Sequence, residues 1–290
     1  MQSKMKCIHP VLVVFLTAGL LVRLAVAQDD VTWVTVEGKA AMEQVSKEEA
    51  RKRAVEDALQ RAREKIAGDS ISVESLAVNF KLSGGIAASI PYIKVVDKTV
   101  LEEGVSNAPK GGASRSETMY RVLLKAGVVE ERTGIDPAFQ LESSLNRTTF
   151  SEGDEMQLRI KSTKDCHVSV FTLMEDGKVL RLLPNRFRST LFLKAGENFV
   201  FPSEKDKKNG VKLVVHLPDN NAGNEALYVL ALNRPFSYNA DRFQEGIYGV
   251  YDGNTAFMND LVREIIGIPL KDRAEKLIQY QIKKDKGGNQ

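Results

Sequence analysis

The stretch VTWVTVEGKAAMEQVSKEEARKRAVEDALQRAREKIAG, residues 31–68, places a strand directly before a long amphipathic helix. Residues 31–36 are β-branched or aromatic and predict a strand that Gly38 ends. Ser46 followed by Glu49 forms a capping box, and Gly68 is suited to the position just after the helix. Apolar residues recur at helical spacing at Ala50, Ala54, Val55, Ala58, Leu59, Ala62 and Ile66. Because this stripe is mostly alanine, we expect the helix to approach a sheet closely.

The residues after this helix predict a long hairpin. Residues 69–80 suggest a second, shorter helix or a mixed segment, whereas residues 90–105 and 118–129 have the composition of strands. Between them, residues 106–117 are rich in Gly, Ser, Asn and Pro and predict a flexible hairpin tip. Residues 28–132 are therefore expected to form an α+β domain, with a helix packed on an antiparallel sheet.

This first domain resembles the N-terminal domain of the flagellar assembly protein T group. The resemblance covers about 100 residues. It lies in the strand ending at Gly38, the alternation of Ala50, Ala54 and Ala58, and the helix-ending Gly68. Members of that group are structural or assembly parts, so the resemblance implies no catalysis.

A period of two residues begins after a linker at residues 133–140. The predicted strands are Met156–Lys161, His167–Met174, Lys178–Leu183, Thr190–Lys194, Asn198–Phe201, Val211–Leu217 and Ala226–Leu232. The tripeptide Glu175-Asp176-Gly177 is typical of a hairpin turn. Short strands at this spacing predict a mainly-β sandwich over residues 141–283.

The sandwich is expected to end in a helix and a strand. Residues 255–267 predict a helix capped by Thr255 and ended by Gly267. Its buried face consists of Phe257, Met258, Leu261, Val262, Ile265 and Ile266. Residues 273–283 alternate and predict a final strand, and residues 284–290 form a polar tail.

The segments at residues 150–185, 211–220 and 226–235 together resemble a bacterial β-sandwich domain of unknown function found in exported proteins. The matching residues are Gly153, Val170, Gly177, Leu182, Pro184, Asn185, Leu217, Pro218 and Ala231. The resemblance implies a fold and no established activity. Asn185 itself has two interpretations: a ligand contact, or a side chain that caps the turn ending a strand, which we favour.

Residues 1–27 have the features of a secretory signal. Lys4 and Lys6 precede a largely apolar run at residues 10–22, and Ala25 and Ala27 predict cleavage after Ala27. We expect a periplasmic protein with no stable membrane span after cleavage. The alternative, a retained anchor, is less favoured because the apolar run is shorter than the ~20 residues of a bilayer span.

Removal of the signal changes the charge and cysteine content of the chain. Of 41 Lys and Arg, three lie in residues 1–27, leaving 38 against 38 acidic residues. This balance argues against nucleic acid as a partner. The basic run at residues 205–208 is interrupted by Asp206 and is interpreted as a solvated loop. Cys166 is then the one remaining cysteine, which excludes an internal disulfide.

Cys166 and His167 are the pair most worth testing for chemistry. Neighbouring residues on a strand point to opposite faces, so they cannot act together as nucleophile and base. His216 could approach Cys166 only from an adjacent strand. We therefore expect a structural cysteine beside an exposed histidine and no enzyme activity, and we expect no cofactor or metal site.

An aromatic, glycine-containing stretch at residues 238–251 offers a candidate partner or ligand surface. It contains Tyr238, Phe243, Tyr248 and Tyr251. Such rings can serve recognition, or they can pack the loop onto the sandwich, which we favour. Our preferred function is a non-catalytic exported envelope protein that binds an envelope protein or a multi-protein assembly as a scaffold or assembly factor. The alternative is a glycan- or peptide-binding module that uses this loop; the oligomeric state is left open.

Overall fold

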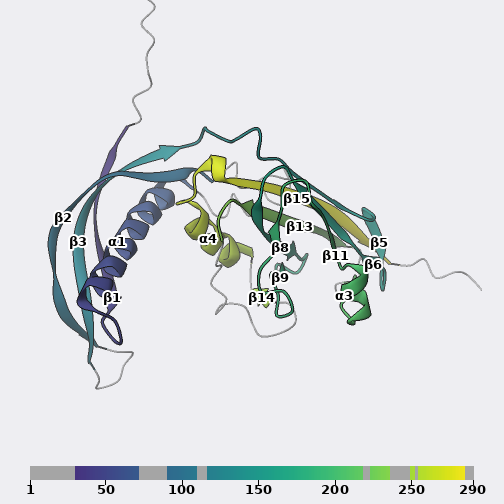
Figure 1. Cartoon of the computed structure of the whole chain (residues 1–290), viewed down its shortest axis with the longest axis horizontal. Coiled ribbons are helices and arrows are strands. Elements are labelled where there is room, and N and C mark those ends of the chain that lie inside the picture. The colour runs from purple at the N-terminus through teal and green to yellow at the C-terminus, as the bar shows by residue number, and fades with distance from the viewer. Residues whose placement is uncertain are drawn as a thin grey trace, which may run out of the picture. The chain divides into compact units, whose positions relative to one another are not determined.

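The computed structural model describes residues 30–71, 90–109, 116–217, 223–235, 249–251 and 254–284. The predicted signal at residues 1–27, the segment 72–80 and nearly all of the polar tail lie outside these ranges, as does part of the hairpin tip. Val31–Gln290 form one compact unit. The protein is mostly β, with few helices (Figure 1).

The first part of this unit is a three-stranded antiparallel sheet with one long helix. The elements are β1 (Thr32–Ala41), α1 (Lys47–Ser70), β2 (Tyr92–Pro109) and β3 (Ser116–Glu131). The strand order is β1-β3-β2, and both pairings are antiparallel. Helix α1 lies along one face of the sheet (Figure 1). The predicted α+β arrangement is confirmed, although all three strands are longer than the sequence indicated.

The alanine stripe of α1 packs directly on β1. Ala50, Ala54, Ala58 and Ala62 are fully buried, as predicted. Gly38 does not end the strand but lies within β1. A Cβ atom placed on it would stand 2.0 Å from the carbonyl oxygen of Ala54. A glycine is therefore required here because the helix backbone touches the strand backbone.

The ends of α1 differ in part from the prediction. Ser46 is the N-cap residue, and its hydroxyl accepts a hydrogen bond from the Glu49 amide, as expected. The Glu49 carboxylate pairs with Arg53 one turn further on. Gly68 does not follow the helix, since α1 continues to Ser70. A single exposed glycine was too weak a stop signal to end a helix whose hydrogen bonds continue.

The remainder of the chain forms one large sheet opposed by two small ones. The strands are β4 (Leu141–Leu145), β5 (Thr149–Ser151), β6 (Glu155–Met156), β7 (Leu158–Ser162), β8 (Cys166–Leu173), β9 (Val179–Leu183), β10 (Phe192–Leu193), β11 (Asn198–Phe201), β12 (Leu213–Val214), β13 (Gly223–Leu232), β14 (Gly249–Tyr251) and β15 (Arg273–Lys283). The helical elements are α3 (Glu204–Lys208), α4 (Asn254–Ile265) and the 3₁₀ turn η3 (Leu270–Asp272).

The large sheet has the order β14-β9-β8-β13-β15-β5, and β10 also pairs with β8. The small sheets are β11-β7-β4 and β12-β6. The predicted sandwich with a C-terminal helix and strand is thus confirmed, and β15 matches residues 273–283 in full. The sequence did not predict β4 and β5. It also overestimated the strand at residues 211–217, of which Leu213–Val214 are in β12.

The basic run at residues 205–208 is a short helix and not the solvated loop that was expected. Ser203 and Asp206 form a reciprocal capping box around the start of α3. The Asp206 carboxylate that interrupts the basic run is the group that makes the helix, because it accepts the backbone N–H of Ser203.

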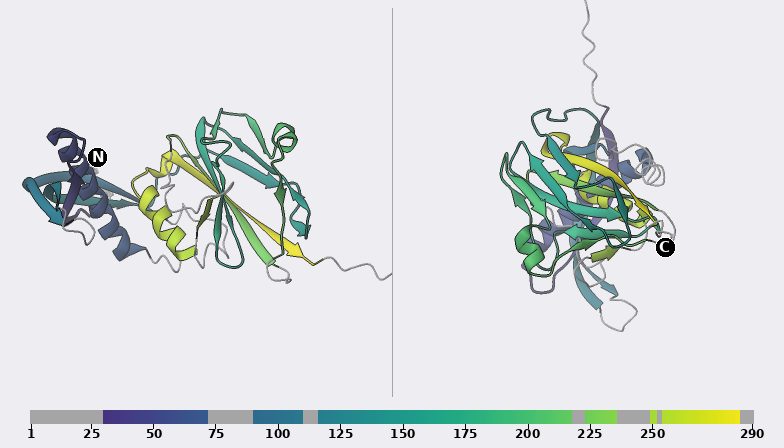
Figure 2. Two further views of the ribbon diagram at one scale, coloured as in Figure 1. Left: turned by 90° about the horizontal axis from the view of Figure 1, so that it is seen from below. Right: turned by 90° about the vertical axis from the view of Figure 1, so that its right-hand side faces the viewer.

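Both faces of β13 are buried, which explains its nearly continuous apolar sequence. Leu227, Val229 and Ala231 pack in the core between the sheets. Tyr228 and Leu230, on the other face, pack in a cluster that includes α4. The predicted buried face of α4 is confirmed at every position. Figure 2 shows α4 lying against the large sheet.

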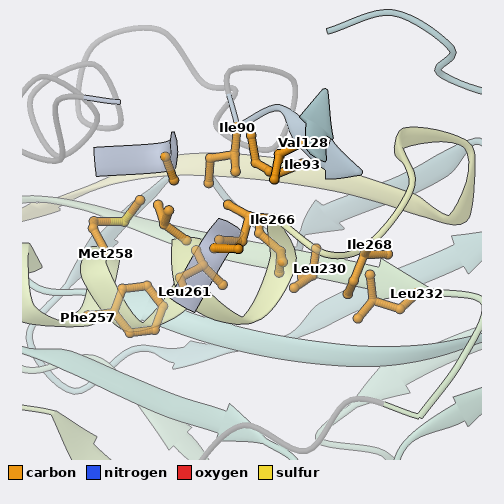
Figure 3. Close-up of a cluster of buried hydrophobic side chains, with 14 of the residues drawn as sticks. Ile90, Ile93, Val128, Leu230, Leu232, Phe257, Met258, Leu261, Ile266 and Ile268 are labelled. Carbon is orange, nitrogen blue, oxygen red and sulfur yellow. The ribbon is translucent and has the colours of Figure 1, made fainter. Parts of the chain in front are cut away.

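The cluster that contains Tyr228, Leu230 and α4 also contains the core of the first sheet (Figure 3). It includes Ile90, Ile93, Val128, Leu230, Leu232, Phe257, Met258, Leu261, Ile266 and Ile268. The Ile93 amide donates to the Ile266 carbonyl at 2.7 Å. Buried Arg273, at the start of β15, donates to the carbonyls of Ile90 and Ile265. Segments far apart in the sequence therefore share one core.

Candidate functional site

The aromatic surface predicted from residues 238–251 falls mostly outside the described part of the chain. Tyr238, Phe243 and Tyr248 lie outside it. Tyr251 is the last residue of β14, and its backbone pairs with Val179 of β9. The aromatic loop therefore stays a prediction.

Cys166 is placed as a structural residue. Its side chain is fully buried in the sandwich core, and burial raises the pKa of its thiol. His167 is half-buried rather than exposed, with its ring 4.9 Å from that of Phe192. His216 follows β12, which pairs with β6 in a different sheet from Cys166. A thiol with a raised pKa is a poor nucleophile, since the thiolate is the reactive form.

Asn185 caps the turn after β9, in agreement with the favoured interpretation. Its side-chain oxygen accepts hydrogen bonds from the amides of Phe187 and Arg188 at 3.0 and 2.9 Å. Its amide nitrogen donates to the Leu182 carbonyl at 3.0 Å. The side chain is buried, and these three bonds use it to fix the loop.

The structure brings together a pair that the sequence did not single out, Glu225 and Tyr280. These residues are direct cross-strand neighbours on β13 and β15. The Tyr280 hydroxyl donates to the Glu225 carboxylate at 2.6 Å, and both side chains are buried. The Tyr280 ring is held edge-to-face against Phe150, with ring centroids 5.8 Å apart. The pair is therefore oriented by packing as well as by hydrogen bonding.

Two cavities meet at this pair. The larger cavity, of about 540 Å³, lies beside the β8–β9 turn, the start of β13 and the loop that precedes β5. The smaller, of about 410 Å³, lies between the large sheet and β12. Its apolar walls are formed by Met156, Met174, Leu180, Leu182, Leu213, Val214 and Val215. Both volumes are in the range of small-molecule sites, roughly 300–1,000 Å³.

The acidic and basic side chains around the smaller cavity differ in their partners. Burial raises the pKa of the Glu225 carboxyl, and the charges of Asp176 and Glu175 act in the same direction. Hydrogen bonds from the Tyr280 hydroxyl and the Glu175 backbone oppose this shift. Burial also raises the pKa of the Tyr280 hydroxyl. Lys212 Nζ lies 2.5 Å from Glu155, and His216 Nδ1 lies 3.0 Å from Glu152. The two basic residues of the lining therefore each have a carboxylate of their own.

The sequence carried one weak signal for this site. Glu225 is the single charged residue in the otherwise apolar run of β13, GNEALYVLAL. A charge inside a strand buried on both faces indicates a paired or functional group. Its partner could not be identified, because Tyr280 is 55 residues away and the register of β13 with β15 is a tertiary property.

A second feature is the exposed edge of the first sheet. Strand β2 pairs with β3 on one side and carries exposed apolar side chains on Val96, Val100, Leu101 and Val105. Leu101 and Val105 are each about half exposed, at 51% and 50%. Register shifts at Val95/Asp97 and Val100/Glu102 bulge the strand. Exposed apolar side chains gathered on one strand are typical of a contact surface.

Among the described residues, no helix is long and apolar enough to cross a membrane. The same residues contain no group of three or more His, Cys, Asp or Glu that could hold a metal ion.

Comparison with known protein families gives a match over part of the chain. No curated protein matches the chain. Residues 149–235, from the start of β5 to just beyond β13, match the family model of a domain of unknown function (DUF4384). The second part of the chain is therefore similar to this domain of unknown function, with Glu225 inside the matched range and Tyr280 outside it.

Proposed function

We propose that this is a non-catalytic, exported protein of the cell envelope that binds another protein as a scaffold or assembly factor. The observation that carries the proposal is the exposed apolar surface of β2. Its side chains are solvent-exposed at the edge of a sheet, and they belong to Val96, Val100, Leu101 and Val105. Burying these side chains against a partner would recover about 25 cal/mol per Å² of apolar area. The similarity to the flagellar assembly protein T group that we predict from the sequence of the first domain would agree with an assembly role.

A comparative capture experiment tests the binding role. The protein and a Leu101→Ser/Val105→Ser double variant are used as bait in native envelope extract. Ile135→Ser is the matched control, because Ile135 is also an exposed apolar residue, at 56%, outside β2. We expect a partner that the unchanged protein and the control retain, that the double variant loses, and that binds again when purified. If no protein separates the double variant from the control, the β2 surface is not a binding surface.

Export is tested separately by the N-terminus of the protein isolated from cells. The proposal requires a periplasmic chain that begins at Gln28. A chain that retains Met1 in the cytoplasm would contradict it.

The second candidate function, a glycan- or peptide-binding module, uses the aromatic residues 238–251. Its support is the composition of that stretch together with the position of Tyr251 in the large sheet. Replacement of Tyr248 and Tyr251 by alanine should abolish ligand binding and leave the melting temperature nearly unchanged. A large loss of stability would instead support a packing role for these rings.

A further inference from the structure

We propose that the smaller cavity between β12 and the large sheet binds a small ligand with an alkylammonium group, for which Glu225 is the counter-ion. The described cavity lining contains no residue of β2, so the inference does not depend on the β2 surface. It follows from the shape of the cavity, the chemistry of its walls and the placement of one buried carboxylate.

The walls suit an aliphatic chain. Seven of the twelve lining residues are Met, Leu or Val, and they come from β6, β9, β12 and the residues directly after β8 and β12. Met156 and Met174 are unbranched and flexible, so they can adapt to a ligand of variable shape. The volume of about 410 Å³ accommodates a short alkyl chain with its head group.

The head group of the ligand is indicated by Glu225. This side chain is only 7% exposed, yet it lines both cavities. Its one hydrogen bond from another side chain comes, among the described residues, from the neutral hydroxyl of Tyr280. A carboxylate taken out of water without a cation is costly, and a cationic group beside it removes that cost.

The other charged groups around Glu225 favour a cation over an anion. Glu175 and Asp176, in the β8–β9 turn, add negative potential at Glu225, and Asp176 is itself paired with Lys178 at 2.6 Å. Lys212 and His216, next to β12, are paired with Glu155 and Glu152. Glu225 is the one acidic residue that the described lining of the smaller cavity contains, and it would repel a carboxylate or phosphate ligand but attract an ammonium group.

The experiment measures binding of n-hexylamine to the purified protein at neutral pH by isothermal titration calorimetry. n-Hexanol and hexanoate are run in parallel, because they keep the chain and change the head group. We expect n-hexylamine to bind at least tenfold more tightly than n-hexanol, and hexanoate not to bind. Equal binding of amine and alcohol, or no binding of the amine at millimolar concentration, would overturn the proposal.

Variants then assign the binding to this cavity. Glu225→Gln keeps the shape of the side chain and the Tyr280 contact but removes the charge. It should weaken the binding of n-hexylamine about 10- to 100-fold. Glu142→Gln is the matched control, since Glu142 is an exposed carboxylate of β4 outside both cavity linings. An unchanged affinity in Glu225→Gln would refute the counter-ion role.

A second variant covers the case in which Glu225→Gln does not fold. Val214 lines the cavity and is 39% exposed, so Val214→Trp can fill the opening without disturbing a buried position. It should abolish n-hexylamine binding while the circular dichroism spectrum stays unchanged. Retained binding in this variant would place the amine elsewhere and overturn the proposal.

The alkylammonium group could belong to a free amine or to a lysine side chain of a peptide. N-acetyl-lysine amide distinguishes these sources. Binding of n-hexylamine alone supports a free-amine ligand, and binding of both compounds supports a lysine-containing one.

Discussion

Replacement of Gly38 by alanine should destabilise the protein far more than an ordinary change in a strand. The added Cβ would stand 2.0 Å from the Ala54 carbonyl oxygen and 2.4 Å from the Ala58 amide nitrogen. Ordinary contact begins at about 3.4 Å. Both atoms belong to the helix backbone, so no rotamer change relieves the clash and α1 must retreat by about 1 Å or more.

The cost follows from this retreat. Overpacking typically costs about 1–3 kcal/mol. A gap of ~1 Å also forfeits roughly half of the dispersion attraction along the alanine stripe. We therefore expect a loss of about 3 kcal/mol or more from a total stability of roughly 5–15 kcal/mol. In thermal unfolding this is a decrease of roughly 6–12 °C for a chain of this size.

Urea denaturation followed by tryptophan fluorescence measures the effect. Trp33 is the only tryptophan in the chain and lies on β1, five residues from Gly38. Gly104→Ala is the matched control, because Gly104 is a strand glycine of β2 whose added Cβ would meet no atom within 4 Å. If Gly38→Ala and Gly104→Ala unfold at the same urea concentration, the close contact between α1 and β1 is refuted.

The other predictions concern single side chains. Gly68→Ala should stabilise the protein by about 0.5–1 kcal/mol in urea denaturation, because Gly68 lies inside α1 with free space around it; destabilisation would mean that it ends the helix. Arg273→Met should cost about 1–3 kcal/mol by the same assay, since it removes the arginine donor from the buried Ile90 carbonyl, whereas the Ile265 carbonyl keeps the Ile268 amide; a change below 0.5 kcal/mol, within the range of surface substitutions, would argue against this role. The folded-state pKa of Glu225 is raised above 4.5, so its contribution to stability is present below that pH and is lost as pH rises through the folded pKa. Unfolding between pH 4.5 and 8 should therefore show Glu225→Gln gaining stability relative to the unchanged protein, and a constant difference would contradict the shift. Cys166 should resist iodoacetamide at pH 8 until urea is added, as followed by mass spectrometry of its peptide; rapid labelling of the native protein would contradict its burial.

Local patterns allowed much of the fold to be predicted. The strand and alanine-striped helix of residues 31–68, the buried face of α4 and the whole of β15 were all identified. Each depends on neighbours within a few positions, where periodicity and capping act. The misses included the short strands β4 and β5, which carry little periodic signal, and the helix stop at Gly68, which competing helical hydrogen bonds overrode. They also included the short helix α3, expected as a loop, and the excess length of the strand at residues 211–217.

The candidate site could not be predicted in the same way. Cys166 and Asn185 were assigned correctly as structural residues, because strand alternation and turn chemistry are local. The pair Glu225–Tyr280 depends on a strand register that no local pattern specifies.

The sequence by itself determined which faces must be buried, because alternation and helical spacing set apolar side chains on one side of an element. Only the tertiary structure decided what covers each face. The alanine stripe of α1 packs on the strand at Gly38, and the two faces of β13 pack in separate cores. Arg273 donates hydrogen bonds to the carbonyls of Ile90 and Ile265. The physical reason is that burial is favourable against any apolar partner of fitting shape. The local sequence therefore determines which face is buried, whereas the residues that cover this face come from distant parts of the folded chain.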